Sequence, residues 1–100
     1  MSTTRRRILI ADDDRDALAI LVAEVRAIDP DAEVRTASTG YRALVACNEW
    51  RPDLAVLDYQ MPGMNGHQLA KLIKIDASFT ALPLVLTSSS PTKRGQIEAE

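Results

Sequence analysis

The strongest constraint on the fold is the regular alternation of short apolar runs with longer segments of helical periodicity. Residues 8–11 form a continuous apolar run rich in isoleucine, which is typical of a strand buried on both faces. Similar runs occupy residues 54–57 and 84–87. Residues 33–37 alternate polar and apolar side chains, as expected of a half-exposed edge strand. The sequence therefore predicts four strands.

Between these runs, apolar residues recur at spacings of three and four, which indicates one face of an amphipathic helix. The three stripes comprise Leu18, Leu21, Val22, Val25 and Ile28; Ala43, Leu44, Cys47 and Trp50; and Leu69, Leu72 and Ile73. Ser90 followed by Pro91 predicts the start of a fourth helix. Apolar strands separated by helices imply an open α/β domain, with a parallel sheet covered on both faces and right-handed crossovers.

Composition narrows the class of protein further. The 100 residues, of which 46% are apolar, suit one globular domain over residues 1–100. The single cysteine excludes an internal disulfide framework, and a net charge of −2 argues against binding nucleic acid by bulk charge. The apolar run that follows Arg5–Arg7 has only four residues, 8–11, whereas the apolar region of a signal peptide has about 7–15. We therefore expect a cytoplasmic protein that spans no membrane.

Polar residues, most of them acidic, stand where the predicted strands end. Asp12 and Asp13 follow the first predicted strand directly, Asp58 closes the third, and Thr87 closes the fourth. Because parallel strands present their carboxyl ends at one edge of the sheet, these side chains should gather there. Carboxylates so close together repel one another unless a cation lies among them. A hard divalent ion with oxygen ligands, Mg²⁺, fits that requirement.

Each acidic segment also has a purely structural interpretation. Asp12–Asp14 alone suits a helix N-terminus, where acids interact favourably with the helix dipole, and we expect Asp14 to act in that way. Asp58 alone, with Pro62 and Gly63 after it, suits a turn. Thr87 alone is an ordinary strand residue. Their common position at strand ends favours the metal site over these separate interpretations.

Three segments together resemble the receiver domain of bacterial two-component response regulators, or the receiver module of a hybrid histidine kinase. They are residues 8–14, residues 57–66 with the block Asp-Tyr-Gln-Met-Pro-Gly-Met-Asn-Gly, and residues 85–88; residues 37–43 also match the turn into the family's second helix. The resemblance covers nearly the whole chain. It implies a flavodoxin-like open parallel sheet of strand order 2-1-3-4, with the family's fifth strand and fifth helix missing from these residues.

The resemblance also implies a function for individual residues. Asp58 would accept a phosphoryl group from a phosphohistidine on a histidine kinase or histidine phosphotransfer protein, forming an acyl phosphate. Asp13, Asp58 and the backbone carbonyl of Gln60 would ligate Mg²⁺ directly, and Asp12 would hold it through water. The domain would then catalyse only its own phosphorylation and dephosphorylation, and would not otherwise be an enzyme.

Two further residues complete the implied switch. Thr87 would hydrogen-bond a phosphoryl oxygen by moving inward from another rotamer, and the small Ser88 would leave access to the phosphoryl group. Phosphorylation adds roughly −1.5 to −2 charges, so neighbouring loops can rearrange and change which partner binds. No DNA-binding segment stands within these residues.

The sequence departs from the family at its C-terminal end. The family's fifth strand ends in a lysine that pairs with the phosphoryl group, whereas these residues stop at Glu100, and Lys93 and Arg94 do not match that lysine. We expect residues 84–86 to form an exposed apolar sheet edge. The chain would then be a fragment of a longer receiver, or a form completed by strand or helix exchange in a homodimer.

Two alternatives to a phosphorylated receiver stay open at this point. One is a receiver-shaped interaction module that is never phosphorylated. The other is an Mg²⁺-dependent phosphatase of the haloacid dehalogenase type, which also uses an aspartate after its first strand. Asp12 and Asp14 have the spacing of that motif, but Arg15 stands where it requires threonine or valine.

Overall fold

The computed structural model describes residues 5–87. The strands are β1 (Arg7–Ala11), β2 (Glu33–Ala37), β3 (Leu54–Asp58) and β4 (Leu84–Thr87). The helices are α1 (Arg15–Ile28), α2 (Gly40–Trp50) and α3 (Gly66–Ile75), with a short 3-10 helix, η1 (Ala77–Phe79), that the sequence analysis did not predict. The predicted alternation of strands and helices is confirmed over this range. The helix expected from Ser90 lies outside the described residues.

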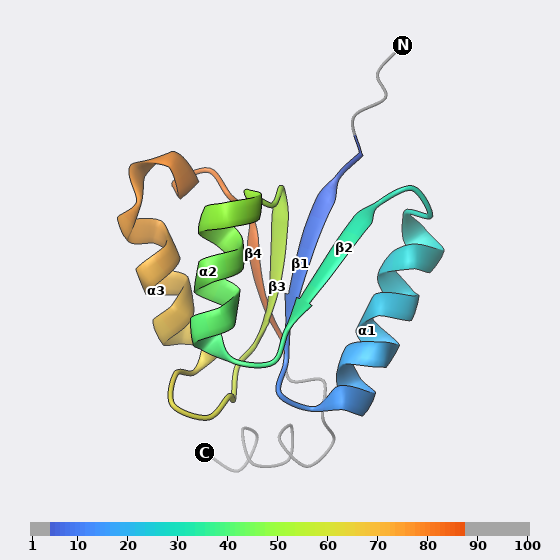
Figure 1. The fold of residues 1–100 in the computed structure, drawn as a ribbon, viewed down its shortest axis with the longest axis horizontal. Helices are drawn as coiled ribbons and strands as arrows, with labels where there is room; N and C mark the ends of the chain where they lie inside the picture. Colours follow the sequence, from blue (N-terminus) through green and yellow to red (C-terminus); the bar gives the residue numbers. More distant parts are fainter. Residues whose placement is uncertain (1–4, 88–100) are drawn as a thin grey trace.

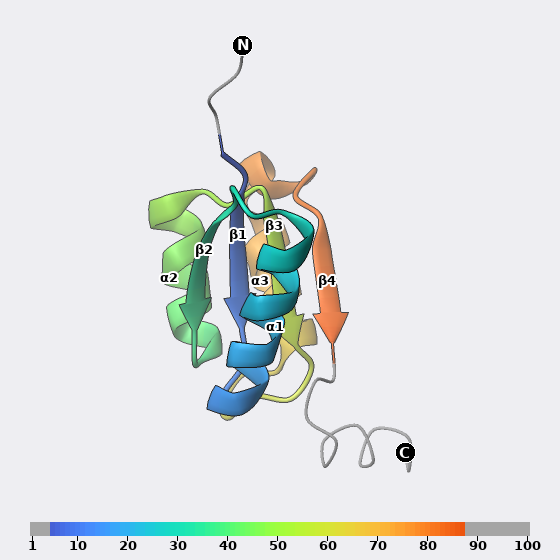
Figure 2. The same cartoon turned by 90° about the vertical axis from the view of Figure 1, so that its right-hand side faces the viewer.

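The strands form one parallel sheet in the order β2-β1-β3-β4, with all four arrows pointing the same way in Figure 2. This arrangement confirms the predicted flavodoxin-like order. The register pairs Ala11 with both Ala37 and Leu57, and it pairs Asp58 with Thr87. The carboxyl ends of the strands therefore lie at one edge of the sheet.

Helices cover both faces of the sheet, which gives three layers. Figure 1 shows α2 and α3 side by side on one face and α1 on the other. The main core lies under α2 and α3, because Leu9, Ala55 and Leu57 from the strands pack there with apolar residues of both helices. Ala43, Leu69 and Ile73 supply much of the helical side, so the core follows the predicted stripes.

The N-termini of the helices are capped by the residues that precede them. The Asp14 side chain accepts hydrogen bonds from the backbone N–H groups of Asp16 and Ala17, at 2.9 and 3.3 Å. At α3, Asn65 and Gln68 bond each other's backbone N–H reciprocally, as in a capping box. The expected role of Asp14 at the start of the first helix is confirmed.

Cys47 is a core residue, as expected of its place on the apolar stripe of α2. Its side chain is fully buried and its thiol is free. Burial raises the pKa of the Cys47 thiol to about 11, and the nearby Arg51 opposes that shift. The thiol therefore stays protonated and behaves as a small apolar group.

Some apolar residues that the periodicity placed in the core are exposed. Ile28 is 86% exposed and Leu72 is 40% exposed, and on β4 the exposed fractions of Val85 and Leu86 are 47% and 42%. Within the described residues α1 is the only helix over its face of the sheet, so nothing covers its last turn. Ile28 there lines an open groove of about 600 Å³ together with Leu54. The expected apolar sheet edge at β4 is present over residues 5–87.

None of the helices in the described range is both long enough and apolar enough to cross a lipid bilayer.

Lys74 fixes the connection between α3 and β4. Its Nζ donates hydrogen bonds to the backbone carbonyls of Phe79, Thr80 and Leu82, at 2.9, 3.0 and 2.5 Å. Three donors on one ammonium group therefore satisfy three carbonyls of a turn that belongs to no strand or long helix. This turn sets where β4 begins.

Replacing this lysine should destabilise the fold. We expect Lys74→Met to lower the free energy of unfolding by about 1–3 kcal/mol, because three carbonyls lose a charged donor. Urea unfolding monitored by circular dichroism measures the difference. Lys71→Met is the matched control, since Lys71 is exposed on the same helix and should shift stability little. Equal effects of the two substitutions would contradict the role given to Lys74.

Candidate metal centre

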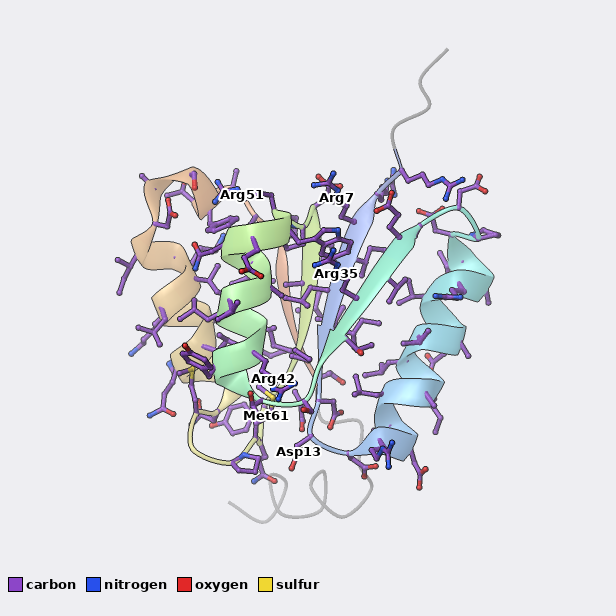
Figure 3. The ribbon with its side chains drawn as sticks, viewed as in Figure 1. Arg7, Asp13, Arg35, Arg42, Arg51 and Met61 are labelled. Atoms are coloured by element: carbon purple, nitrogen blue, oxygen red, sulfur yellow. The ribbon has the colours of Figure 1, made fainter. Side chains whose placement is uncertain are left out.

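Three carboxylates from two strand ends converge at one edge of the sheet. One oxygen from each of Asp12, Asp13 and Asp58 can be chosen such that all three lie within 4.8 Å of one another. Asp12 and Asp58 are fully buried, and Asp13 is half-buried. Figure 3 shows Asp13 at the end of the molecule toward which the strands point. The gathering of acids that the sequence predicted is therefore present in the structure.

Backbone contacts hold Asp12 where β1 ends. The Asp12 N–H donates to the carbonyl of Ala37, the last residue of β2, at 3.0 Å. In turn, Asp12 Oδ1 accepts a hydrogen bond from the N–H of Asp14 at 2.9 Å. Only residues 12–14 separate β1 from α1. These two hydrogen bonds hold Asp12 at this junction, where it is fully buried.

Asp58 lies at the junction of β3 with its following loop. It is in register with Thr87 of β4, and the N–H of Tyr59 donates to the Thr87 carbonyl at 2.8 Å. The N–H of Gln60 approaches Asp58 Oδ1 at 3.4 Å. Partner residues in register point to the same side of a sheet, so Thr87 flanks Asp58. Ser88 lies outside the described residues.

The loop after Asp58 closes on itself. The N–H of Gly66, the first residue of α3, donates to the Tyr59 carbonyl at 2.9 Å. Within the loop, Met61 is buried in the main core and Gly63 takes a positive φ of 78°. The loop is therefore anchored at both ends and in the middle, although it contains no regular secondary structure.

The cluster fits a hard divalent cation. Its donors are carboxylate oxygens, with no cysteine or histidine in this group. Mg²⁺ prefers oxygen ligands, whereas softer metals prefer thiolate ligands. Two of the carboxylates are fully buried, and like charges held this close favour a compensating positive charge. Asp12, Asp13 and Asp58 would hold the ion, and the Gln60 carbonyl, two residues beyond Asp58, is the candidate further ligand.

The arginines near the opposite end of the molecule serve a different purpose. Figure 3 shows Arg7 and Arg51 at the end away from Asp13. Arg7 Nη1 donates to the Trp50 carbonyl at 2.7 Å, and the Arg35 guanidinium lies 5.0 Å from the centroid of the Trp50 ring. These contacts tie the C-terminus of α2 to β1 and β2.

Comparison with known proteins agrees with this geometry. The pattern that defines the response regulator receiver domain matches residues 8–99. The chain therefore belongs to the response regulator receiver domain family, and it is a signalling domain of the phosphoacceptor type. This family match does not support the alternative of a phosphatase of the haloacid dehalogenase type.

Curated relatives include the DNA-binding response regulator MtrA of Mycobacterium tuberculosis, which is 36% identical over 89 residues. The match covers 89% of this chain and 37% of that protein. The cyclic di-GMP phosphodiesterase response regulator RpfG of Xanthomonas campestris is 32% identical over 95 residues, covering 92% of this chain and 25% of the relative. The chain thus spans only about a third or less of these relatives.

Solved structures show the same fold. Chemotaxis response regulator CheY4 of Vibrio cholerae superposes with a TM-score of 0.77 and 26% identity, covering 96% of this chain and 80% of that one. The N-terminal domain of a response regulator receiver protein from Methanoculleus marisnigri gives a TM-score of 0.76 and 25% identity, with 96% and 79% covered.

Neutralising one carboxylate should change the free energy of unfolding in two ways: it removes repulsion between the acids, and it weakens the stabilisation by Mg²⁺. We expect Asp13→Asn, measured in EDTA, to raise the free energy of unfolding by about 1–2 kcal/mol, because one like charge leaves the cluster. Adding Mg²⁺ at about 100 times its dissociation constant should stabilise the unmodified chain by about 2.7 kcal/mol, and the variant by much less. Urea unfolding with and without Mg²⁺ gives both values.

Asp31→Asn is the charge-matched control, because Asp31 is exposed in the turn between α1 and β2. It should leave the response to Mg²⁺ unchanged. The cluster would not be a metal site if Mg²⁺ stabilised the unmodified chain no more than it stabilised Asp13→Asn.

Proposed function

We propose that Asp58 is the phosphoacceptor of this receiver domain, which takes a phosphoryl group from a phosphohistidine and passes the signal on by changing its binding partner. The observation that carries the proposal is the convergence of Asp12, Asp13 and Asp58 at the carboxyl edge of the sheet. An Asp58 oxygen attacks phosphorus, the new P–O bond gives an acyl phosphate, and the P–N bond to the donor imidazole breaks with its electron pair returning to nitrogen.

All three acids would also hold the metal. Asp13, Asp58 and the Gln60 carbonyl would bind Mg²⁺ directly, and Asp12 would hold it through water. When bound, Mg²⁺ offsets the negative charge that otherwise keeps an anionic phosphoryl group away from a carboxylate. The loop anchored by Met61 keeps Gln60 near Asp58, so the ligands are positioned before the phosphoryl group arrives.

Thr87 responds to the phosphoryl group in this proposal. The support for Thr87 is its register with Asp58 and the hydrogen bond from Tyr59 to its carbonyl, which keep its main chain fixed while its hydroxyl rotates. The hydroxyl then donates to a phosphoryl oxygen. Ser88 lies outside the described residues, and its small side chain is the reason to expect that it leaves access to the phosphoryl group. Since Val85 and Leu86 of the same strand are partly exposed, a change at Thr87 is transmitted to an accessible surface.

The partners follow from this chemistry. A histidine kinase or a histidine phosphotransfer protein supplies the phosphoryl group, and the domain, spanning residues 1–100, works in the cytoplasm. It acts on no substrate other than its own Asp58. The relatives MtrA and RpfG are named for a DNA-binding and a phosphodiesterase function, and this chain matches a minor part of each.

A phosphorylation assay tests the proposal directly. The chain is incubated with Mg²⁺ and acetyl phosphate and its intact mass is measured. We expect one added phosphoryl group that is absent in Asp58→Asn and in EDTA. The Asp31→Asn variant should still gain it. A chain that binds Mg²⁺ and gains no mass is an interaction module, and a mass gain that persists in Asp58→Asn places the acceptor elsewhere.

The exposed edge of β4 supports a further part of the proposal, namely that this edge pairs with another strand, either from a longer form of the receiver or from a second copy of the chain. Val85 and Leu86 offer apolar side chains there, and an exposed strand edge is a template for pairing with another chain. A homodimer formed by strand pairing or by strand or helix exchange would cover both residues.

Sedimentation velocity across a range of concentrations tests this self-association. We expect a dimer, and we expect Val85→Lys to shift the chain toward monomer because a charge on the edge opposes pairing. Thr36→Lys, at an exposed position on β2 at the other edge of the sheet, should leave the dimer intact. A monomer that unfolds cooperatively at all concentrations would contradict pairing at β4.

A further inference from the structure

Gly66 is packed directly against the backbone of Asp58. A Cβ atom placed on Gly66 would lie 2.4 Å from the Asp58 carbonyl oxygen and 3.0 Å from its carbonyl carbon. Real Cβ atoms do not approach other atoms so closely, and a peptide group cannot rotate aside as the end of a side chain can. The first residue of α3 therefore reaches the end of β3 only because it has no side chain.

The other glycines in the described range differ in kind. A Cβ on Gly63 would meet nothing within 4 Å, and a glycine suits this position for a different reason, its positive φ of 78°. The three atoms nearest to a Cβ on Gly40 would all belong to the Met64 side chain, the closest at 2.9 Å. Among residues 5–87, the glycine that touches the acidic edge through backbone is Gly66.

The contact controls two groups at once. The Gly66 N–H holds the Tyr59 carbonyl at 2.9 Å while its Cα faces the Asp58 carbonyl. Residues 59–65 are thus a loop whose two ends are fastened side by side, and Gln60 lies inside it. Pushing Gly66 away would shift the backbone that carries both Asp58 and Gln60.

We infer that Gly66 is a positioning residue for the metal and the phosphoacceptor: its close approach to Asp58 sets where the Asp58 carboxylate and the Gln60 carbonyl stand. This inference rests on the proposed function of Asp58. It assigns to Gly66 a role beyond starting a helix, for which alanine would serve better than glycine.

The inference is tested by comparing two alanine substitutions, one at the start of α3 and one in the loop before it. Gly66→Ala adds a methyl group against Asp58, whereas Gly63→Ala adds only the strain of a left-handed backbone and meets no neighbour. Mg²⁺ affinity is measured by titration calorimetry at 10 °C, and the initial rate of acyl phosphate formation is measured against Mg²⁺ concentration. We expect Gly66→Ala to weaken Mg²⁺ binding by about 10–100-fold, as for other groups that orient metal ligands, and Gly63→Ala to weaken it less, because its strain acts on the loop and not directly on Asp58.

A double substitution separates the two contacts of the added methyl group. That group would also lie 3.1 Å from Leu86 Cδ2, so Leu86→Ala relieves crowding against β4 and leaves the clash with Asp58 in place. Mg²⁺ binding should stay weak in Gly66→Ala with Leu86→Ala. Recovery of binding in the double variant would attribute the defect to Leu86 and overturn the inference, as would unchanged binding in Gly66→Ala alone.

A measurement on the unmodified chain covers the case in which the variants do not fold. Hydrogen exchange of the Gly66 amide, followed by NMR, should slow when Mg²⁺ is added, because the metal fixes the loop that this amide closes. An exchange rate that Mg²⁺ leaves unaltered, in a chain that binds it, would overturn the inference. Failure of the unmodified chain to bind Mg²⁺ or to be phosphorylated would instead count against the proposed function.

Discussion

The parallel pairing of β1 with β3 is the interaction on which the acidic site depends. It brings the end of one strand, with Asp12 and Asp13 after it, beside Asp58 at the end of the other, although more than forty residues separate them in sequence. The resulting cluster of like charges, two of them fully buried, opposes folding unless a cation or other partners compensate. A metal-dependent function and the stability of this edge are therefore linked by the same electrostatics.

The two ends of the sheet differ in the contacts they make. At the amino end, arginines bind the C-terminus of α2 through Trp50, and Arg51 lies 4.2 Å from the centroid of the Phe79 ring. These contacts fix helices to the sheet. At the carboxyl end, the backbone itself orients the acids, through the hydrogen bond of Asp12 with Ala37 and the closed loop from Tyr59 to Gly66. Backbone contacts suit a site of this kind because they hold ligands without adding competing side chains.

Membership of the receiver family explains why the fold is shared with proteins of different output. The relatives MtrA and RpfG are much longer than the matched segment and differ in what their names assign to them. What this chain shares with them is the sheet and the segments around its acidic edge. Within residues 5–87, β4 adjoins that edge, because Asp58 is in register with Thr87, and its residues Val85 and Leu86 are partly exposed.

The strand positions, the helical stripes and the cap at Asp14 were all determined by the sequence, because each depends on local periodicity or on a few neighbouring residues. The convergence of the acids could also be predicted, since parallel strands must end at one edge. Periodicity could not show that Ile28 and Leu72 would stay exposed, because it identifies a helix face without showing how far the opposing surface extends. The contact of Gly66 with Asp58 was decided by tertiary structure alone, since it exists only when the loop between them closes.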